Sequence, residues 1–126
     1  NTDIHGWINW DMKSHQVQRF IDAFDDPYKG ASTIINGKRV RIKKVFLHSG
    51  EINNHPFMTG LIYRHDIDWI CVNSIDANIF LIKEVIDSNG NNIISNLKTG
   101  DRFYTPNSKL ENRNLRVRYN SKGIKK

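Results

Sequence analysis

Basic side chains are concentrated at positions 38–44, where they alternate with apolar residues. The cluster consists of Lys38, Arg39, Arg41, Lys43 and Lys44. If this segment is a β-strand, its odd-numbered cations share one face and its apolar residues the other, because successive strand side chains alternate. Such a row suits binding of phosphate groups or of a partner. The solvated face of an ordinary half-buried strand has the same pattern, and we favour that interpretation.

The net charge of the chain, +6, is located at its C-terminal end. Residues 109–126 contain seven basic residues and one acidic residue, whereas the rest of the chain holds twelve of each. A neutral body is not expected to offer the broad cationic surface that nucleic-acid binding requires. We therefore treat residues 107–126 as a basic tail, in which Arg116 and Arg118 are further candidates for contact with a substrate or partner.

Residues able to perform catalysis or bind a metal do not form a recognisable arrangement. The histidines are scattered: His5, His15, His48, His55 and His65. None has a second ligand at metal-binding spacing, so ordinary surface or loop histidines are expected. Asp66 and Asp68 would share a strand face, where carboxylates are usually just solvated. The glycines form neither a phosphate-binding loop nor a nucleophile elbow. We expect no catalytic residue, metal site or cofactor in this chain.

The length and composition fit one domain without a membrane span or a signal peptide. We therefore expect a cytoplasmic protein that does not contact a membrane. The single cysteine, Cys71, lies in an apolar run and is interpreted as a small buried residue rather than a reactive thiol. The chain begins with Asn1 rather than Met, which suggests a segment cut from a longer protein.

Apolar periodicity predicts one helix over residues 13–24, since Val17, Phe20, Ile21 and Phe24 share a helix face. Either Asp11 or Ser14 is expected to cap its start, and Pro27 to bar its continuation. Afterwards the period becomes two. Strands are predicted at 32–35, 39–47, 60–63, 67–73, 79–86, 92–94 and 103–104, with turns between them. Short strands with one helix predict a mainly β fold, a small closed or half-open barrel.

Five short motifs follow one another in an order that resembles the C-terminal domain of formyltransferases. They are Gly6-Trp7-Ile8-Asn9-Trp10, Ile21-Asp22-Ala23, Pro27 to Ala31, Arg39-Val40-Arg41-Ile42 and Gly60-Leu61-Ile62. The resemblance runs from about Asp3 to Tyr104 and rests on the order and spacing of these pieces. It implies a small OB-like Greek-key barrel with one N-terminal helix capping an end, and residues 1–126 would form this single domain.

The resemblance also implies what the domain does. The family includes methionyl-tRNA formyltransferases and enzymes that N-formylate nucleotide-linked amino sugars, and its catalytic residues and formyl-tetrahydrofolate site lie in an N-terminal domain absent from this chain. Asp22 stands where the family usually has a basic residue, which argues against tRNA and favours an amino-sugar enzyme. Two alternatives are tRNA binding and a free-standing OB-like module without enzymatic function. Expected partners are the missing catalytic domain and a second copy of the protein.

Two tryptophans, Trp7 and Trp10, open the domain ahead of the predicted helix. Aromatic residues near cations can stack on the bases of single-stranded nucleic acid. Because both indoles precede the helix rather than lying on strands, we interpret them as packing residues, either within the core or against the missing catalytic domain.

Overall fold

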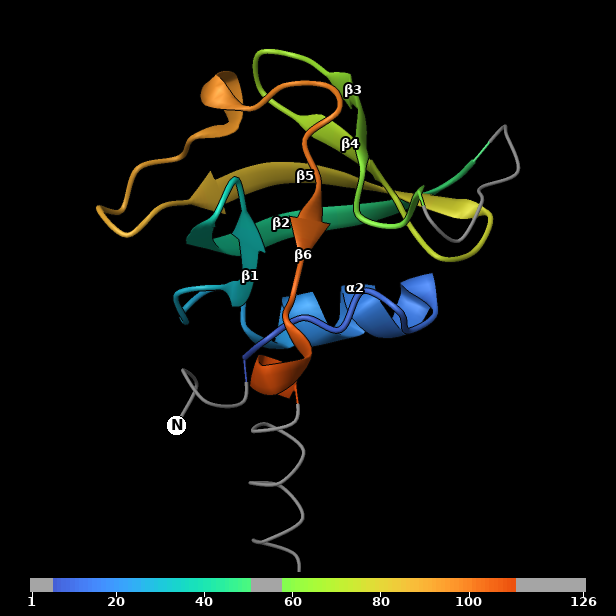
Figure 1. Ribbon diagram of the computed structural model, residues 1–126, viewed down its shortest axis with the longest axis horizontal. Coiled ribbons are helices and arrows are strands. Elements are labelled where there is room, and N and C mark those ends of the chain that lie inside the picture. The colour runs from blue at the N-terminus through green and yellow to red at the C-terminus, as the bar shows by residue number, and fades with distance from the viewer. Residues whose placement is uncertain (1–5, 51–57, 111–126) are drawn as a thin grey trace, which may run out of the picture.

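The computed structural model describes residues 6–50 and 58–110, and its main element is a curled antiparallel sheet (Figure 1). The elements in chain order are the helix α2 (Ser14–Ala23), the strands β1 (Ala31–Ile35), β2 (Lys38–Ser49), β3 (Ile62–His65), β4 (Ile70–Asn73) and β5 (Asn78–Ile86), the 3-10 helix η2 (Ile94–Asn96) and the strand β6 (Phe103–Tyr104). The sheet order is β3-β4-β5-β2-β1-β6. The prediction of a mainly β, OB-like barrel with one capping helix is therefore confirmed.

The order of the strands is that of a Greek key. Strands β3, β4 and β5 are consecutive neighbours, and β2, which precedes them in the chain, lies on the far side of β5. The longest pairing joins β2 and β5, from Arg41 opposite Ile86 to Ser49 opposite Asn78. These two long strands form the centre of the sheet and curve over the helix (Figure 1).

The two edges of the sheet meet next to the short strand β6. Leu61 forms an isolated antiparallel bridge with Arg102. Backbone hydrogen bonds of 2.8 Å run from Ile62 N–H to Asp101, from Gly100 N–H to Ile62 and from Phe103 N–H to Gly60. These bonds satisfy backbone groups that would otherwise form open edges.

The helix α2 lies against β2 and β5 and covers one end of the barrel, as Figure 1 shows. Its predicted boundaries are correct to within a residue, but the predicted N-terminal caps are wrong. No side chain of the preceding segment caps the helix. Instead Asp76, in the β4–β5 connection, accepts hydrogen bonds from Ser14 N–H (2.9 Å) and Ser14 Oγ (3.0 Å). The cap is thus a tertiary contact, which the local sequence could not show.

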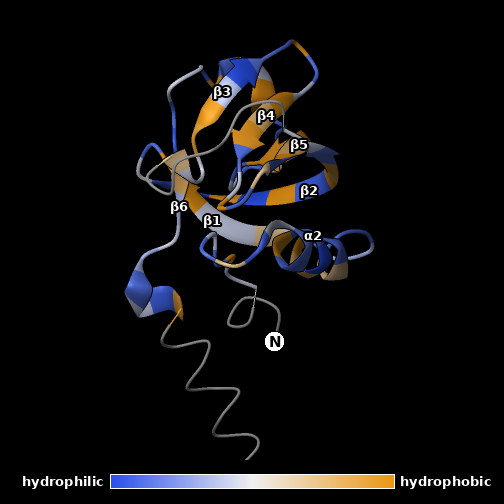
Figure 2. Cartoon of the chain, turned by 90° about the vertical axis from the view of Figure 1, so that its right-hand side faces the viewer, coloured by the Kyte–Doolittle hydropathy of each residue, from blue (hydrophilic) through white to orange (hydrophobic). Residues whose placement is uncertain are grey.

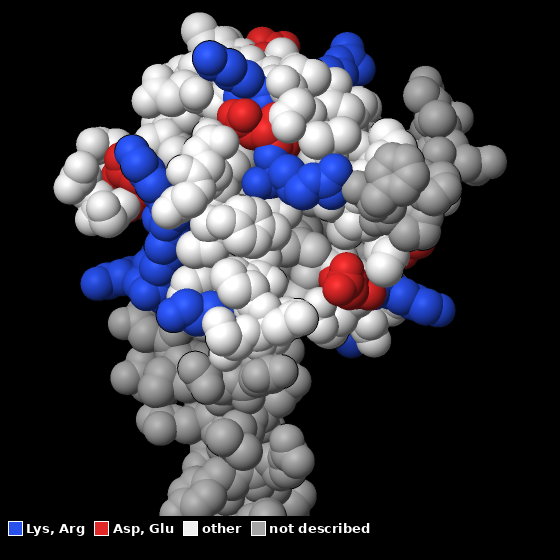
Figure 3. Space-filling model, in the orientation of Figure 1, with Lys and Arg blue, Asp and Glu red and all other residues white. Residues whose placement is uncertain are grey.

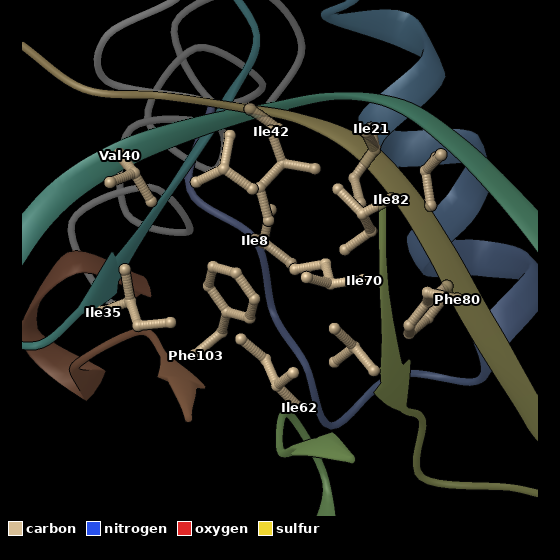
Figure 4. Close-up of a cluster of buried hydrophobic side chains, with 14 of the residues drawn as sticks. Ile8, Ile21, Ile35, Val40, Ile42, Ile62, Ile70, Phe80, Ile82 and Phe103 are labelled. Carbon is tan, nitrogen blue, oxygen red and sulfur yellow. The ribbon is translucent and has the colours of Figure 1, made fainter. Parts of the chain in front are cut away.

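The core fills the space between the sheet and α2. In Figure 4 side chains from the N-terminal segment, α2 and the strands converge on one another, among them Ile8, Ile21, Ile42 and Phe103. Alternating apolar and polar bands along the strands, visible in Figure 2, supply these inward residues. Cys71 is buried as predicted, and burial raises the pKa of its thiol.

Three predicted strands differ from the structure. The strand expected at 60–63 is shifted to Ile62–His65. Residues 67–73 form a strand only from Ile70, because Asp66 to Trp69 make a turn closed by a 2.8 Å bond from Asp66 N–H to Trp69 O. The expected strand at 92–94 is reduced to a bridge between Asn92 and Ile86, followed by η2. No helix in the described part of the chain is long and apolar enough to cross a membrane.

Candidate functional site

The basic row on β2 lies on the outer face of the barrel, as the alternation predicted. Val40 and Ile42 are buried, whereas Arg39, Arg41 and Lys43 are only partly covered. These three cations line a groove of about 680 Å³ that extends to β5 and to the loop after it. In Figure 3 Lys and Arg side chains form a column along the left margin, over the start of β2 and the turn below it. This groove, lined by β2, β5 and the turn before β1, is the candidate site.

One wall of the groove is the turn that precedes β1. Tyr28 and Lys29 line the groove from this turn. Gly30 adopts φ +111°, a conformation that favours glycine, and a Cβ atom there would lie 2.9 Å from Lys43 Cγ and 3.1 Å from Arg41 Cβ. The turn therefore packs directly on the floor of the groove, which explains why glycine occupies this position of the Pro27 to Ala31 motif.

Two carboxylates fix the same turn to β2. Asp26 forms ion pairs with Lys43 and with Lys44, the latter at 2.8 Å. Asp25 accepts a 3.0 Å hydrogen bond from Lys44 N–H, where Lys44 adopts φ +58°. Hydrogen bonds from Lys43 and Lys44 lower the pKa of Asp26 to about 2. Two of the five cations in the sequence cluster thus hold the turn in place, and their charges are balanced by Asp25 and Asp26.

Arg39, at the N-terminal end of the row, contacts β1 and the N-terminal segment. Its Nε and Nη2 donate to Ser32 Oγ at 3.1 and 2.8 Å, and its guanidinium lies 4.7 Å from the centroid of the Trp7 ring. Lys109 Nζ lies 5.4 Å from the same ring. Trp7 forms a parallel bridge with Ser32, which brings the N-terminal segment beside β1. Arg39 of the row and Lys109 of the C-terminal segment therefore both lie against one indole ring.

The opposite wall carries acidic groups. Glu84, on β5, pairs in register with Lys43, and Asp87 follows at the end of the strand. Asp87 Oδ1 accepts hydrogen bonds of 2.9 Å from Asn89 N–H and from Asn91 N–H, which shape the loop. The groove thus presents cations on its floor and one wall and carboxylates on the other wall.

The remaining predicted site residues are distributed as follows. Lys38 is exposed at the β1–β2 turn and does not line the groove, whereas Arg116 and Arg118 lie outside the described residues. Among residues 6–50 and 58–110, no three His, Cys, Asp or Glu side chains are placed to hold a metal ion. Asp66 and Asp68, expected on one strand face, lie in the turn before β4 instead.

The two tryptophans are buried within this domain, with 6% and 5% of Trp7 and Trp10 exposed. The Trp10 ring stacks on Phe103 with centroids 5.6 Å apart, and its indole N–H donates to Thr33 Oγ1 at 2.9 Å. Of the two packing roles considered for Trp10, the structure shows the one in the core. A role for either residue at a contact with a catalytic domain stays a prediction.

Sequence reasoning missed Tyr28, Lys29, Glu84 and Asp87 as groove residues. The Pro27 to Ala31 motif was a signal for the wall, since its proline and glycine are turn residues that come directly before the cationic hairpin. The carboxylates gave no signal, because only the register between β2 and β5 brings them opposite the cations.

The sequence was compared with models of known protein families and with curated proteins. Residues 2–98 match the family model of the formyl transferase C-terminal domain, and no match was found among curated proteins. The matched segment contains the N-terminal tryptophans, α2, the glycine turn and strands β1 to β5. Because the match spans most of the chain, this protein belongs to the formyl transferase C-terminal domain family.

Proposed function

We propose that this domain is the accessory barrel of an enzyme that transfers a formyl group from formyl-tetrahydrofolate to the amine of a nucleotide-linked amino sugar. The family identifies an accessory domain of a formyl transferase. By the family resemblance, the catalytic residues and the folate site would lie in a separate N-terminal domain. The barrel would pack against that domain, form one wall of the substrate cleft or contribute contacts between two copies of the enzyme.

The observation that carries the choice of an amino sugar is the internal use of the β2 cations. Lys43 and Lys44 pair with Asp25 and Asp26, and Arg39 binds Ser32 and stacks on Trp7. A tRNA-binding face needs Lys and Arg side chains directed at phosphates along an extended path. Here the groove also carries two carboxylates, and Asp22 is exposed on α2. A polyanion would be repelled at these positions.

A second candidate function is binding of methionyl-tRNA, which the charge of residues 109–126 favours. The two functions are tested by one pair of assays on the full-length protein. Formyl-tetrahydrofolate is supplied together with either nucleotide-linked amino sugars or initiator methionyl-tRNA, and formylated product is quantified. We expect product only with an amino sugar. Formylation of methionyl-tRNA alone would overturn the proposal, and formylation of neither acceptor would favour a free-standing binding module.

A further inference from the structure

The groove has the volume of a small-molecule site, and its lining is mostly charged and polar. Its volume of about 680 Å³ lies within the range of roughly 300–1,000 Å³ that ligand pockets occupy. Tyr28 lines it with half of its side chain, 52%, exposed to solvent. An exposed ring beside a groove offers a flat surface on which a heterocyclic base can stack.

The wall that carries Tyr28 is fixed before any ligand arrives. Gly30 allows the turn to touch Arg41 and Lys43, and Tyr28 N–H donates to Asp25 O at 2.9 Å. Asp25 in turn accepts from the backbone of Lys44. Because these contacts hold the turn, little conformational entropy would be lost when a ligand binds to it.

Cations and carboxylates occupy different sides of the groove. Lys29 and Arg41 line it near Tyr28, where a phosphate group attached to a stacked nucleoside would lie within reach of either. Arg presents several N–H donors in a planar fork that matches phosphate oxygens. Glu84 and Asp87 on the far wall can only accept hydrogen bonds when ionised, which suits the hydroxyl groups of a ribose.

We infer that this groove binds a nucleoside diphosphate, with the base on Tyr28, the diphosphate at Lys29 and Arg41 and sugar hydroxyls toward Glu84 and Asp87. The choice of a nucleoside diphosphate over other aromatic anions rests in part on the proposed function, since it is the carrier portion of a nucleotide-linked sugar. The mixed charge of the groove favours this small ligand over RNA, whose successive phosphates would meet the carboxylates.

Calorimetric titration of the 126-residue chain with UDP and with GDP tests the inference. At least one of them should bind more tightly than inorganic pyrophosphate or the bare nucleoside, because each of these lacks one half of the contacts. Tyr28→Ala should weaken binding roughly tenfold. Arg41→Gln and Lys29→Gln should each weaken it on the order of tenfold. Thermal unfolding of each variant confirms that it is folded. If Arg41→Gln does not fold, Lys29→Gln alone tests the diphosphate contact.

Two matched variants control for general effects. Lys38→Gln removes a charge from the same strand outside the groove, and Tyr104→Ala removes a ring that is 45% exposed elsewhere. Both should bind the nucleotide like the unchanged chain. The inference is overturned if neither nucleotide binds, if the controls weaken binding as much as the groove variants, if pyrophosphate binds as tightly, or if single-stranded RNA binds more tightly through the same residues.

The outcome is separable from that of the acceptor assay. Full-length protein that formylates amino sugars while its barrel binds no nucleotide would disprove this inference alone. Nucleotide binding in the groove by a protein that formylates only methionyl-tRNA would disprove the proposed function alone.

Discussion

Asp76 shows how a single side chain joins distant parts of this fold. Its Oδ2 accepts from the backbone and hydroxyl of Ser14, while its Oδ1 accepts from Asn78 N–H at 3.0 Å and from Ser74 Oγ at 2.9 Å. The start of α2 and the β4–β5 connection therefore share one carboxylate. A negative charge at the helix N-terminus also interacts favourably with the helix dipole.

Replacing Asp76 should destabilise the domain more than replacing Asp11, one of the two caps expected from the sequence. Asp76→Ala removes the acceptor for the first helical N–H and leaves Ser14, which is fully buried, without it. We expect a loss of about 1–2 kcal/mol in the free energy of unfolding, measured by urea denaturation. Asp11→Ala is the control and should change little, since no side-chain cap comes from that segment. Equal losses would contradict the assignment.

Stability should also depend on acid through the same residue. Burial alone would raise the pKa of Asp76, but hydrogen bonds from Ser14, Asn78 and Ser74 outweigh it and hold the pKa at about 2, below the ordinary aspartate value of 3.8. Because the pKa is lower in the folded than in the unfolded state, ionised Asp76 stabilises the fold at pH values above the unfolded pKa. This contribution is lost as the pH falls from about 4 to about 2. Asp76→Asn should therefore lose less of its thermal midpoint across that window than the unchanged protein.

Asp26 is a second carboxylate with a lowered pKa, and its effect on stability in acid can be compared with that of Asp76. Its pKa is also about 2, because Lys43 and Lys44 donate to it, but its carboxylate is exposed. Ion pairs at the surface contribute little and are screened by salt. In about 0.5 M salt, roughly three times physiological ionic strength, the part of the acid dependence that Asp26 contributes, measured as the difference between the unchanged protein and Asp26→Asn, should largely vanish, whereas the part that Asp76 contributes should persist.

At the scale of elements, the deepest contacts of α2 come from its smaller apolar residues. Val17 and Ile21 are fully buried, whereas Phe20 and Phe24 pack on each other at the margin of the core, with ring centroids 5.0 Å apart. Ile21→Ala should cost about 2–5 kcal/mol in unfolding free energy, the range for a fully enclosed side chain. Phe20→Ala should cost less, and chemical denaturation of the two variants decides the order.

Closure of the barrel depends on a close approach at Gly60. This residue has φ +84°, and a Cβ atom there would lie 2.3 Å from the carbonyl oxygen of Phe103. Phe103 belongs to β6, the strand that completes the sheet. Gly90 has φ +86° with no atom near its Cβ position, so it isolates the backbone cost from the clash. Gly90→Ala should lower the free energy of unfolding by about 1 kcal/mol. Gly60→Ala should lower it considerably more, and the thermal midpoints of the two variants measure the difference. Similar effects would mean that the β3–β6 contact is not tight.

Local patterns in the sequence predicted the elements whose reasons are local. The helix face containing Val17 and Ile21 follows from period 3.6, and the two faces of β2 follow from period two. The cap from Asp76 and the carboxylates opposite β2 depend on register between segments far apart in the chain, so no local pattern contains them. The turn at Asp66 to Trp69 was hidden because its apolar Ile67 and Trp69 continue the strand alternation.

At the scale of the whole molecule, charge is divided between a balanced barrel and a basic tail. Within the barrel, Lys43 and Lys44 face Asp25 and Asp26, and the groove cations face Glu84 and Asp87. The excess positive charge of the sequence belongs to residues 109–126. Any attraction of this chain for nucleic acid should accordingly come from the tail and be independent of sequence.

Deleting residues 113–126 should abolish whatever affinity the chain has for tRNA. The tail carries most of the excess charge, and phosphate contacts release counterions, so the affinity before deletion should fall steeply as salt is added. Arg41→Gln is the matched change in the barrel and should leave both the affinity and its salt slope unaltered, since Arg41 lines a groove that also holds Glu84 and Asp87. Filter binding of labelled tRNA over a series of salt concentrations measures both quantities. If affinity survives the deletion but is lost in Arg41→Gln, the outer face of β2 is the nucleic-acid surface, and a tRNA-directed enzyme becomes the better description of the protein.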